Sequence, residues 1–518
     1  MSGPRPKHRF EKALSEYESL TIEHARLQLA QNTAGERYTE SVTMPGRMDM
    51  AGQKISKRFS VRTLILLAAL IGIAVLLGFV FTRRMVDFPV YYAAGKSLIS
   101  GRGDLYSPTF ARSPVMDYRY PPFFLISFLP LWHLGYPLAA YIWYGFEVLD
   151  IAICVWAVRS ALIFARKPGL KMLDRSPHAR SSVKPKSGAK IAVVSVLITG
   201  QYFVMSLHYG NAQLLATALL LASLYLAVKR RDVPAGLLMA LSIAIKLVPV
   251  LLLPYFFVRR RWKYLACTTL CLVAINLAPA VYFGFRSNIA LTGEWYRHVI
   301  ADQEFHEING PINLSLKGQM QRSMSVVPYQ ERLDGDVNYP QVNFVTANRE
   351  TVGRAWIVAD TLLYISGLLI LLFASPGGQT PTDKGERAEA GSIVGSREML
   401  ELGLMVCLML LAAPLTSKIY FAALLWPVAS LAYYCFGNLT RTGATLRRIL
   451  KVIAAISFLL PLLPGRFLQR FLLVLGADFY LTFLLMIILA WADLSIRTPP
   501  PAQDGERRTP FPPTATTP

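Results

Sequence analysis

The stretch LILLAALIGIAVLLGFVF, residues 64–81, is a run of 18 residues without a charged side chain. A helix rises about 1.5 Å per residue, so a run of this length is sufficient to cross a hydrocarbon core of roughly 30 Å. The polar segment before it is much longer than the short basic region that opens a cleavable signal sequence. The run is therefore interpreted as a retained first membrane span.

Apolar runs of similar length recur along the rest of the chain. Hydrophobic residues make up 53% of the sequence and charged residues 17%, which is typical of a membrane protein and unusual for a soluble one. The sequence predicts an all-α fold, a polytopic transmembrane helical bundle with about 10–12 membrane segments. The further runs are 138–164, 191–208, 211–228, 234–258, 262–283, 355–374, 398–416, 419–437, 449–464 and 467–492.

Basic residues exceed acidic residues by a wide margin. There are 54 Lys and Arg against 32 Asp and Glu, a formal net charge of +22. In a soluble protein this excess would suggest nucleic acid, but in a membrane protein it first reports topology, because short loops rich in Lys and Arg remain in the cytoplasm. Such clusters precede the first span and occupy the linker 165–190. We expect no nucleic-acid partner.

This charge distribution orients the predicted spans. It places the loops 83–137 and 284–354 outside the cell membrane and both termini in the cytoplasm. The predicted domains are a cytoplasmic N-terminal arm over 1–60, a transmembrane domain over 61–494, and a disordered cytoplasmic tail over 495–518.

Residues 234–258 lie between two basic clusters that are both assigned to the cytoplasm, so this stretch must enter the membrane and return. Lys246 and Pro249 lie near its middle, and a Pro-broken pair of half-helices, re-entrant from the inner face, satisfies the requirement. The stretch 123–134 follows two prolines and is too short to span, which predicts an interfacial or re-entrant helix.

Several kinds of site are missing from the sequence. There is no Gly-rich nucleotide-binding motif and no H-E-x-x-H, and none of the five cysteines forms a C-x-x-C pair. His298 and His306 lie among acidic residues without the spacing of a closed ligand set. The sequence predicts neither a metal nor a cofactor.

Asp87 lies shortly after the first span, at the start of the first outer loop. A carboxylate there could reach a lipid head group at the membrane surface. Position alone leaves two interpretations open: a residue of an active site, or a solvated acid that pairs with Arg83 or Arg84.

A series of short motifs follows in order along the chain. They are Asp-Phe-x-x-Tyr-Tyr-x-Ala at 87–94, Leu-Tyr at 105–106, Tyr-x-Tyr-Pro-Pro at 118–122, Gly-Asn-Ala-Gln at 210–213, Ala-Gly, Lys-x-x-Pro and Arg-Trp within 235–262, and Asn-Leu-Ser-Leu at 313–316 with Arg322. Over roughly residues 60–440 this ordered series resembles glycosyltransferase family 87, of the GT-C superfamily.

The resemblance implies a hexosyltransferase, commonly a mannosyltransferase, that takes its sugar from a polyprenyl-phosphate donor and passes it to a lipid or glycan acceptor among the membrane lipids. It implies that a first-loop Asp is the catalytic base, and Asp87 matches that position. One motif departs from the family. The late Ser-Pro-x-Ser-Trp-x-His-His element corresponds here to residues 413–420, which lack the Trp and both His, and Lys418 or Tyr420 could substitute for them.

The chemistry of such a donor needs few protein groups. A sugar on a lipid phosphate already carries a good leaving group, so one carboxylate that accepts the proton of the attacking hydroxyl is enough, while cations stabilise the departing phosphate. Direct displacement of this kind inverts the anomeric centre. Lys246 is the main phosphate candidate because a lysine in an apolar run is costly. The alternatives are an ion pair with Glu147 or Asp150, or a side chain that reaches the interface.

The remaining candidates are aromatic, amide and arginine side chains that would bind substrate. Each also has an ordinary structural interpretation, as an interfacial aromatic, a turn-forming amide or a solvated charge. They are Tyr91, Tyr92, Arg119, Tyr120, Asn211, Gln213, Asn313 and Arg322.

Two rival functions remain open. A secondary transporter or lipid flippase usually has matched internal repeats with interruptions near the membrane midplane, and only one such interruption is evident here. A catalytically altered family member, which binds lipid without transferring sugar, would account for the missing histidines.

Overall fold

The computed structural model describes residues 72–73, 75–100, 105–106, 118–165, 186–301, 313–326, 340–373, 384–437 and 441–497. All of them belong to one compact unit, Leu70–Pro518. The expected arm 1–60, half of the first span, most of the linker 165–190 and nearly all of the tail lie outside the described residues.

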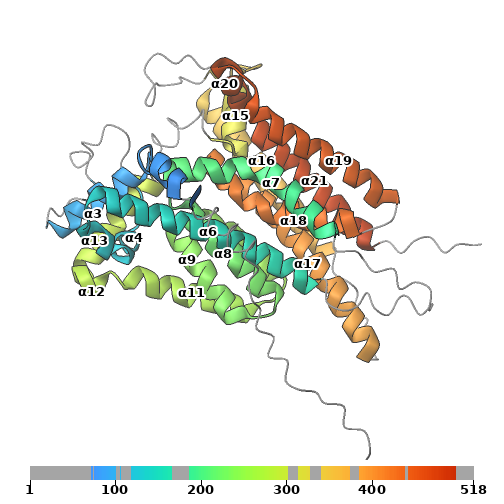
Figure 1. Cartoon of the computed structure of the whole chain (residues 1–518), viewed down its shortest axis with the longest axis horizontal. Helices are drawn as coiled ribbons and strands as arrows, with labels where there is room; N and C mark the ends of the chain where they lie inside the picture. The colour runs from blue at the N-terminus through green and yellow to red at the C-terminus, as the bar shows by residue number, and fades with distance from the viewer. Residues whose placement is uncertain are drawn as a thin grey trace, which may run out of the picture. The chain divides into compact units, whose positions relative to one another are not determined.

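The described residues form helices and connecting turns and contain no strand, so the prediction of an all-α fold is confirmed (Figure 1). The elements are α3 (Phe88–Ile99), α4 (Pro122–Ser127), α5 (Leu129–His133), α6 (Tyr136–Ala165), α7 (Lys186–Tyr209), α8 (Gln213–Val228), α9 (Asp232–Ile245), η1 (Val248–Leu252), α10 (Leu253–Val258), α11 (Trp262–Leu277), α12 (Ala280–Phe283), α13 (Phe285–Trp295), η2 (Tyr296–Ile300), α15 (Leu316–Met324), α16 (Arg349–Phe373), α17 (Lys384–Ala412), η3 (Lys418–Leu424), α18 (Leu425–Gly437), α19 (Arg441–Leu459), η4 (Leu460–Leu462), α20 (Arg466–Leu475) and α21 (Ala477–Arg497).

Six helical stretches among the described residues are long and apolar enough to cross a membrane. Shorter apolar helices accompany them, among them α8, whose 16 residues span only about 24 Å. The protein is therefore a multi-pass membrane protein. The six stretches are Tyr136–Ala165, Gly188–Tyr209, Trp262–Phe283, Arg349–Leu372, Lys418–Phe436 and Ala477–Ser495.

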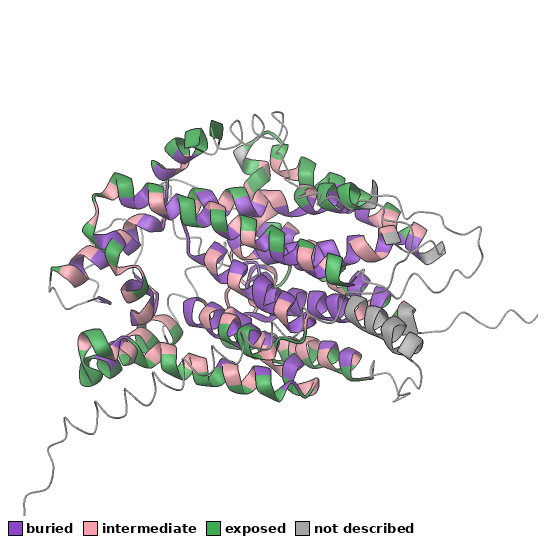
Figure 2. Ribbon diagram, turned by 60° about the horizontal axis from the view of Figure 1, so that its bottom comes forward, coloured by how far each residue is buried: buried purple, intermediate pink, exposed green. Residues whose placement is uncertain are grey.

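Helices at the centre of this unit are buried on most faces, and those around them keep an apolar face exposed (Figure 2). Every residue of the second half of α17 and most described residues of α18 are buried. On the periphery, Leu270 of α11 and Leu362 of α16 are 70% and 63% exposed. A broad apolar exterior is expected where the solvent is lipid rather than water.

The stretch 234–258 is broken as predicted. Helix α9 ends at Ile245, the backbone of Lys246 is extended, and η1 and α10 carry the chain back. The two ends of the stretch meet, because Arg261, just after α10, forms an ion pair with Asp232, the first residue of α9. The contact brings both ends of the stretch together at the base of one hairpin, as a re-entrant pair requires.

The base of this hairpin is clamped to α17 by ion pairs. Arg230 and Arg261 both bind the carboxylate of Glu398, at 3.0 and 3.1 Å, and Arg259 and Arg397 both bind Glu401. The two basic clusters that the sequence placed inside thus converge on one helix.

Two further stretches that the sequence predicts as single helices are each divided in the structure. The stretch 123–134 is helical, as expected, but it divides at Phe128 into two short helices, α4 and α5. The run 467–492 was expected to be one span, but it divides at Gly476 into α20 and α21. Gly476 has a φ of +84°, and a Cβ on it would lie 2.1 Å from Oε1 of Gln319. Close packing against α15 therefore ends the first helix there.

The close packing of α9 against α11 at Gly236 can be tested by substitution. A Cβ at Gly236 would lie 2.7 Å from the carbonyl oxygen of Tyr264. Gly236→Ala should destabilise the protein by about 1–3 kcal/mol, because backbone atoms would have to separate. Thermal denaturation in detergent micelles measures the effect. The control is Gly145→Ala in α6, where a Cβ meets nothing within 4 Å; equal losses in both variants would contradict the account.

Candidate active site

The turn between α7 and α8 forms the floor of the candidate site. Helix α7 ends at Tyr209, and Gly210 follows with a φ of +62°. A Cβ on Gly210 would lie 2.8 Å from Cγ of Met85, so only glycine allows the approach of this neighbouring segment. The following residue, Asn211, is buried and faces the same segment.

Asp87 is joined to this turn by backbone and side chain. The amides of Val86 and Asp87 both donate to the carbonyl oxygen of Tyr209, at 3.0 and 2.8 Å. Asp87 is the N-cap residue of α3, but its side chain does not cap the helix. Its Oδ2 accepts a hydrogen bond from Nδ2 of Asn211, and its Oδ1 accepts none from the described residues. One carboxylate oxygen therefore remains for another donor.

Two tyrosine hydroxyls extend the hydrogen bonds around Asp87. The hydroxyl of Tyr91 donates to the hydroxyl of Tyr120 at 2.8 Å, and Tyr120 donates to Oδ1 of Asn211 at 3.2 Å. Tyr91, Tyr120 and Asn211 are all less than 10% exposed. Motifs that lie up to 124 residues apart in the sequence thus meet in one connected network.

Lys246 approaches the same network from the tip of the α9–α10 hairpin. Its Nζ lies 4.5 Å from the ring centroid of Tyr120 and 5.5 Å from that of Tyr420. Both distances are within the range of a cation–π interaction. The positive charge also interacts with Asp87. The break at Lys246 therefore delivers a cation to the carboxylate, and none of the ion pairs considered from the sequence, with Glu147 or Asp150, forms.

Burial governs the acidity of Asp87, whose side chain is almost completely removed from solvent. Burial raises the pKa of this carboxyl above its ordinary value, because the charged form loses its hydration. The hydrogen bond from Asn211 and the charge of Lys246 partly offset that rise. The carboxylate is a stronger base than an exposed aspartate for the same reason.

Asn313 and Arg322 lie in a second buried cluster, which fixes the turn before η3. Oδ1 of Asn313 accepts from the amide of Thr416 at 3.1 Å, and its Nδ2 donates to the carbonyl of Pro414 at 3.0 Å. Arg322, which is fully buried, donates to the carbonyl of Asn313 at 2.5 Å. This cluster holds the start of η3, and η3 carries Tyr420 to Lys246.

Two other predicted residues have contacts away from the Asp87 network, and a third, Gln213, touches it through its backbone alone. The hydroxyl of Tyr92 donates to the carbonyl of Leu134. Lys418 pairs with Asp478 at 3.9 Å. The amide of Gln213 donates to Oδ1 of Asn211, while its side chain turns to Thr217.

Arg119 enters the site region through its backbone, where its carbonyl accepts a hydrogen bond from Trp295 of α13 at 3.2 Å. Asp87 forms no ion pair with Arg83 or Arg84 within the described part of the chain, and Arg83 instead lies over the ring of Phe79. The solvated-acid interpretation of Asp87 is not what the structure shows.

Sequence reasoning missed Trp143 and undervalued Glu147, both on the buried face of α6. Nε1 of Trp143 donates to the carbonyl of Gly210 at 3.0 Å, which supports the turn from below. Glu147 lies one turn further along, is 1% exposed, and interacts electrostatically with Asp87. Neither of its oxygens has a hydrogen-bond partner among the described residues. The sequence does contain a signal for them: Trp143 and Glu147 are four residues apart on an apolar helix, so they share one face of it.

This unpartnered carboxyl predicts an unusual stability response. Glu147→Leu should raise the thermal stability in detergent micelles, by on the order of 1–3 kcal/mol, because a buried polar group without a partner is removed. The contrasting variant is Glu401→Leu, which removes a carboxylate bound by Arg259, Arg397 and Tyr255 and should be strongly destabilising. A comparable loss of stability in both variants would show that Glu147 has a partner.

Possible metal ligands are sparse in this region. Among the described residues no group of three or more His, Cys, Asp or Glu side chains is arranged to hold a metal ion. The donors that surround Asp87 are amide, phenol and ammonium groups, which suit anionic and hydroxylic ligands rather than a cation.

The structure is that of an integral membrane protein, a helical bundle that holds a buried carboxylate beside a cation. The sequence model of glycosyltransferase family 87 matches residues 118–376, half of the chain. The chain belongs to this family and is a membrane glycosyltransferase. The match includes Tyr120, Asn211 and Lys246, whereas Asp87 precedes it.

One curated relative shares a shorter stretch of sequence. It is the polyprenol-phosphate-mannose-dependent alpha-(1-2)-phosphatidylinositol mannoside mannosyltransferase of Mycolicibacterium smegmatis (strain ATCC 700084 / mc(2)155). The two are 25% identical over 204 residues, which cover 37% of this chain and 43% of the relative. The chain thus matches less than half the length of that relative. No solved structure matches the chain.

Proposed function

We propose that this glycosyltransferase transfers a hexose, with mannose the first candidate, from a polyprenyl-phosphate-linked donor to a lipid or glycan acceptor. Asp87 is the general base, the transfer inverts the anomeric centre, and the reaction takes place at the extracytoplasmic face of the cell membrane. The observation that carries the proposal is the buried carboxylate of Asp87, with one oxygen bound by Asn211 and the other open to a donor.

The open oxygen has the properties that a base needs. A general base must lie within hydrogen-bond reach of the hydroxyl whose proton it takes, and Oδ1 of Asp87 accepts no hydrogen bond from the described residues. The bond from Asn211 fixes the plane of the carboxylate. Burial keeps bulk water away from the carboxylate, which favours a sugar hydroxyl over water as the nucleophile.

Lys246 supplies the positive charge that the leaving group requires. As the bond between the anomeric carbon and the phosphate oxygen breaks, its electron pair stays on the phosphate, which becomes a monoester with greater negative charge. The ammonium of Lys246 lies at the tip of the hairpin, next to the rings of Tyr120 and Tyr420. The phenol of Tyr420 can donate to a phosphate or sugar oxygen, whereas that of Tyr120 already donates to Asn211.

The transfer is a single displacement in which every bond, proton and electron pair is accounted for. The acceptor oxygen forms a bond to the anomeric carbon from the face opposite the phosphate, its proton passes to Oδ1 of Asp87, and the polyprenyl phosphate leaves. Attack from the opposite face inverts the configuration of that carbon. No covalent intermediate with the protein is required, which agrees with a single carboxylate at the centre of the network.

The identity of the sugar and of the acceptor rests on the relative. Its name gives a polyprenol-phosphate-mannose donor and a phosphatidylinositol mannoside acceptor. The late turn of this chain, residues 413–420, lacks the Trp and both His that the family usually has there, and Tyr420 occupies the position next to Lys246. We therefore keep the acceptor as a lipid or glycan of unspecified structure.

The site and the basic clusters are proposed to lie at opposite membrane faces. The Asp87 network is formed at the tip of the α9–α10 hairpin, and the arginines at its base bind Glu398 and Glu401. Because short basic loops remain in the cytoplasm, the network lies outside, and both termini are assigned to the cytoplasm.

The base assignment is tested by Asp87→Asn. This substitution keeps the shape of the side chain and removes its basicity, so transfer from radiolabelled polyprenyl-phosphate mannose to a lipid extract should fall by at least ~100-fold. Purified protein in liposomes is the preparation. Transfer at the wild-type rate would refute the role of Asp87, and a wild-type protein without transfer from any hexose donor would favour the transporter or the altered-member hypothesis.

The electrostatic link between Lys246 and Asp87 predicts a pH effect. The base acts in its ionised form, so kcat/KM rises as pH increases through the raised pKa of Asp87. Lys246 lowers that pKa, so Lys246→Gln should move the acidic limb of the profile to higher pH as well as reducing the rate. Lys246→Arg, which retains the charge, should restore the wild-type limb. A limb that stays in place, or that moves to lower pH in Lys246→Gln, would contradict the link.

A further inference from the structure

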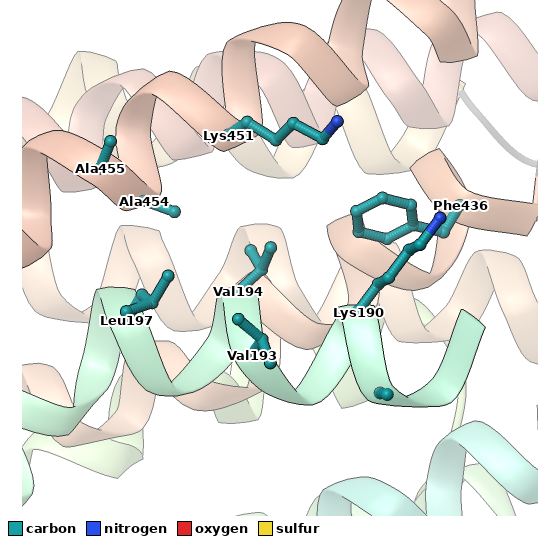
Figure 3. Close-up of a pocket in the computed structure, with 9 residues that line it drawn as sticks. Lys190, Val193, Val194, Leu197, Phe436, Lys451, Ala454 and Ala455 are labelled. Carbon is teal, nitrogen blue, oxygen red and sulfur yellow. The ribbon is translucent and has the colours of Figure 1, made fainter. Parts of the chain in front are cut away.

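A groove lies between α7 and α19, with Phe436 of α18 beside Lys190 at one end (Figure 3). It has a volume of about 410 Å³, within the usual size range of small-ligand sites. Its walls are apolar apart from two lysines. The lining residues are Ala189, Lys190, Val193, Val194, Leu197, Phe436, Lys451, Ala454 and Ala455.

Small side chains account for the space. Ala454 and Ala455 of α19 lie at the Leu197 end of the groove, so the two helices leave room between them where larger residues would interdigitate (Figure 3). Val193 is 56% exposed, which means that the groove opens on the outer surface of the helices. In a bilayer this surface contacts lipid chains, and an apolar groove there is filled by hydrocarbon.

The charges are collected at one end of the groove. Figure 3 shows the ammonium groups of Lys190 and Lys451 at the same end, away from Leu197 and Ala455. Neither lysine forms an ion pair with a carboxylate of the described residues, and both are exposed. Arg447, one turn before Lys451, donates to the carbonyl of Cys435 at the end of α18 and adds positive charge beside them. The groove therefore joins an apolar channel to a cationic mouth.

This mouth is distant from the Asp87 network. Lys190 and Tyr209 lie 19 residues apart on the continuous helix α7, about 28 Å along its axis, which is close to the thickness of a hydrocarbon core. Tyr209 binds the backbone of Asp87, so the two lysines lie at the opposite end of the membrane-crossing helix from the candidate active site. A lipid bound here cannot be the donor or acceptor bound at Asp87.

We propose that this groove binds an anionic phospholipid, with the phosphate between Lys190 and Lys451 and one acyl chain along Val193, Val194 and Ala455. The charge complementarity identifies the head group, because two ammonium groups with no carboxylate partner among the described residues, at one end of a membrane-crossing helix, favour an anionic lipid over a zwitterionic one. Five residues of α7 line the groove between Ala189 and Leu197, a rise of roughly 12 Å, so the site extends along most of one leaflet of a hydrocarbon core of roughly 30 Å. The proposal does not depend on the function assigned to Asp87.

The test compares head groups on the purified full chain. Native mass spectrometry of delipidated protein, titrated with dioleoyl-phosphatidylglycerol or dioleoyl-phosphatidylcholine, should show one preferred site for phosphatidylglycerol. Lys190→Gln combined with Lys451→Gln should weaken that site about 30-fold, which corresponds to about 1 kcal/mol per lysine. The matched control, Arg159→Gln with Lys263→Gln, removes two exposed charges elsewhere and should leave the site unchanged.

A second variant tests the channel separately from the charges. Ala455→Trp fills the groove from an exposed position without removing packed atoms, and it should weaken phosphatidylglycerol binding while both lysines remain. Inorganic phosphate at the same concentration should not compete. Equal affinity for the two lipids, full binding by Ala455→Trp, competition by phosphate alone, or an equal loss in the control variant would each overturn the proposal.

Discussion

Two hydrogen bonds to one carbonyl oxygen determine where the candidate base lies. The amides of Val86 and Asp87 both donate to Tyr209, the last residue of a helix that crosses the membrane unit. This pair of hydrogen bonds requires Gly210, which follows Tyr209 in the left-handed conformation, because any side chain there would displace Met85. The loop after the first span and the α7–α8 turn thereby become one rigid element, and Asn211 is presented to the carboxylate as a consequence.

The second constraint is the cost of placing a lysine inside the bundle. A charge at depth in a membrane protein is unfavourable by roughly 2.5–3.5 kcal/mol on insertion scales, so it persists where a function or a partner compensates it. Lys246 is surrounded by two aromatic rings and a carboxylate rather than by a partner of its own. The ion pairs of Arg230, Arg259 and Arg261 with α17 anchor the opposite end of the hairpin and so fix the position of its tip.

Much of this architecture follows from the sequence by simple physical rules. The break at Lys246 was predictable, because a single straight helix would have placed the two basic clusters on opposite faces, and both were required inside. The division at Gly476 was not, since the reason for it is contact with Gln319, which is more than 150 residues away in the sequence. In the same way, Asp87, Tyr91, Tyr120, Asn211 and Lys246 were each selected separately, but only the fold shows that they meet. The sequence supported Tyr92 and Lys418 equally well as substrate-binding residues, but their contacts lie outside the Asp87 network.

The central claim is that the Asp87 network holds the reacting sugar, and a structure with a bound donor tests it most directly. Cryo-electron microscopy of the protein with a non-transferable polyprenyl-phosphate mannose analogue would locate the phosphate and the anomeric carbon. The account predicts the phosphate within about 4 Å of Nζ of Lys246, with the open oxygen of Asp87 facing the side of the sugar opposite the phosphate. A donor bound with its anomeric carbon remote from Asp87, for example beside Arg322 and η3, would contradict the assignment of both residues.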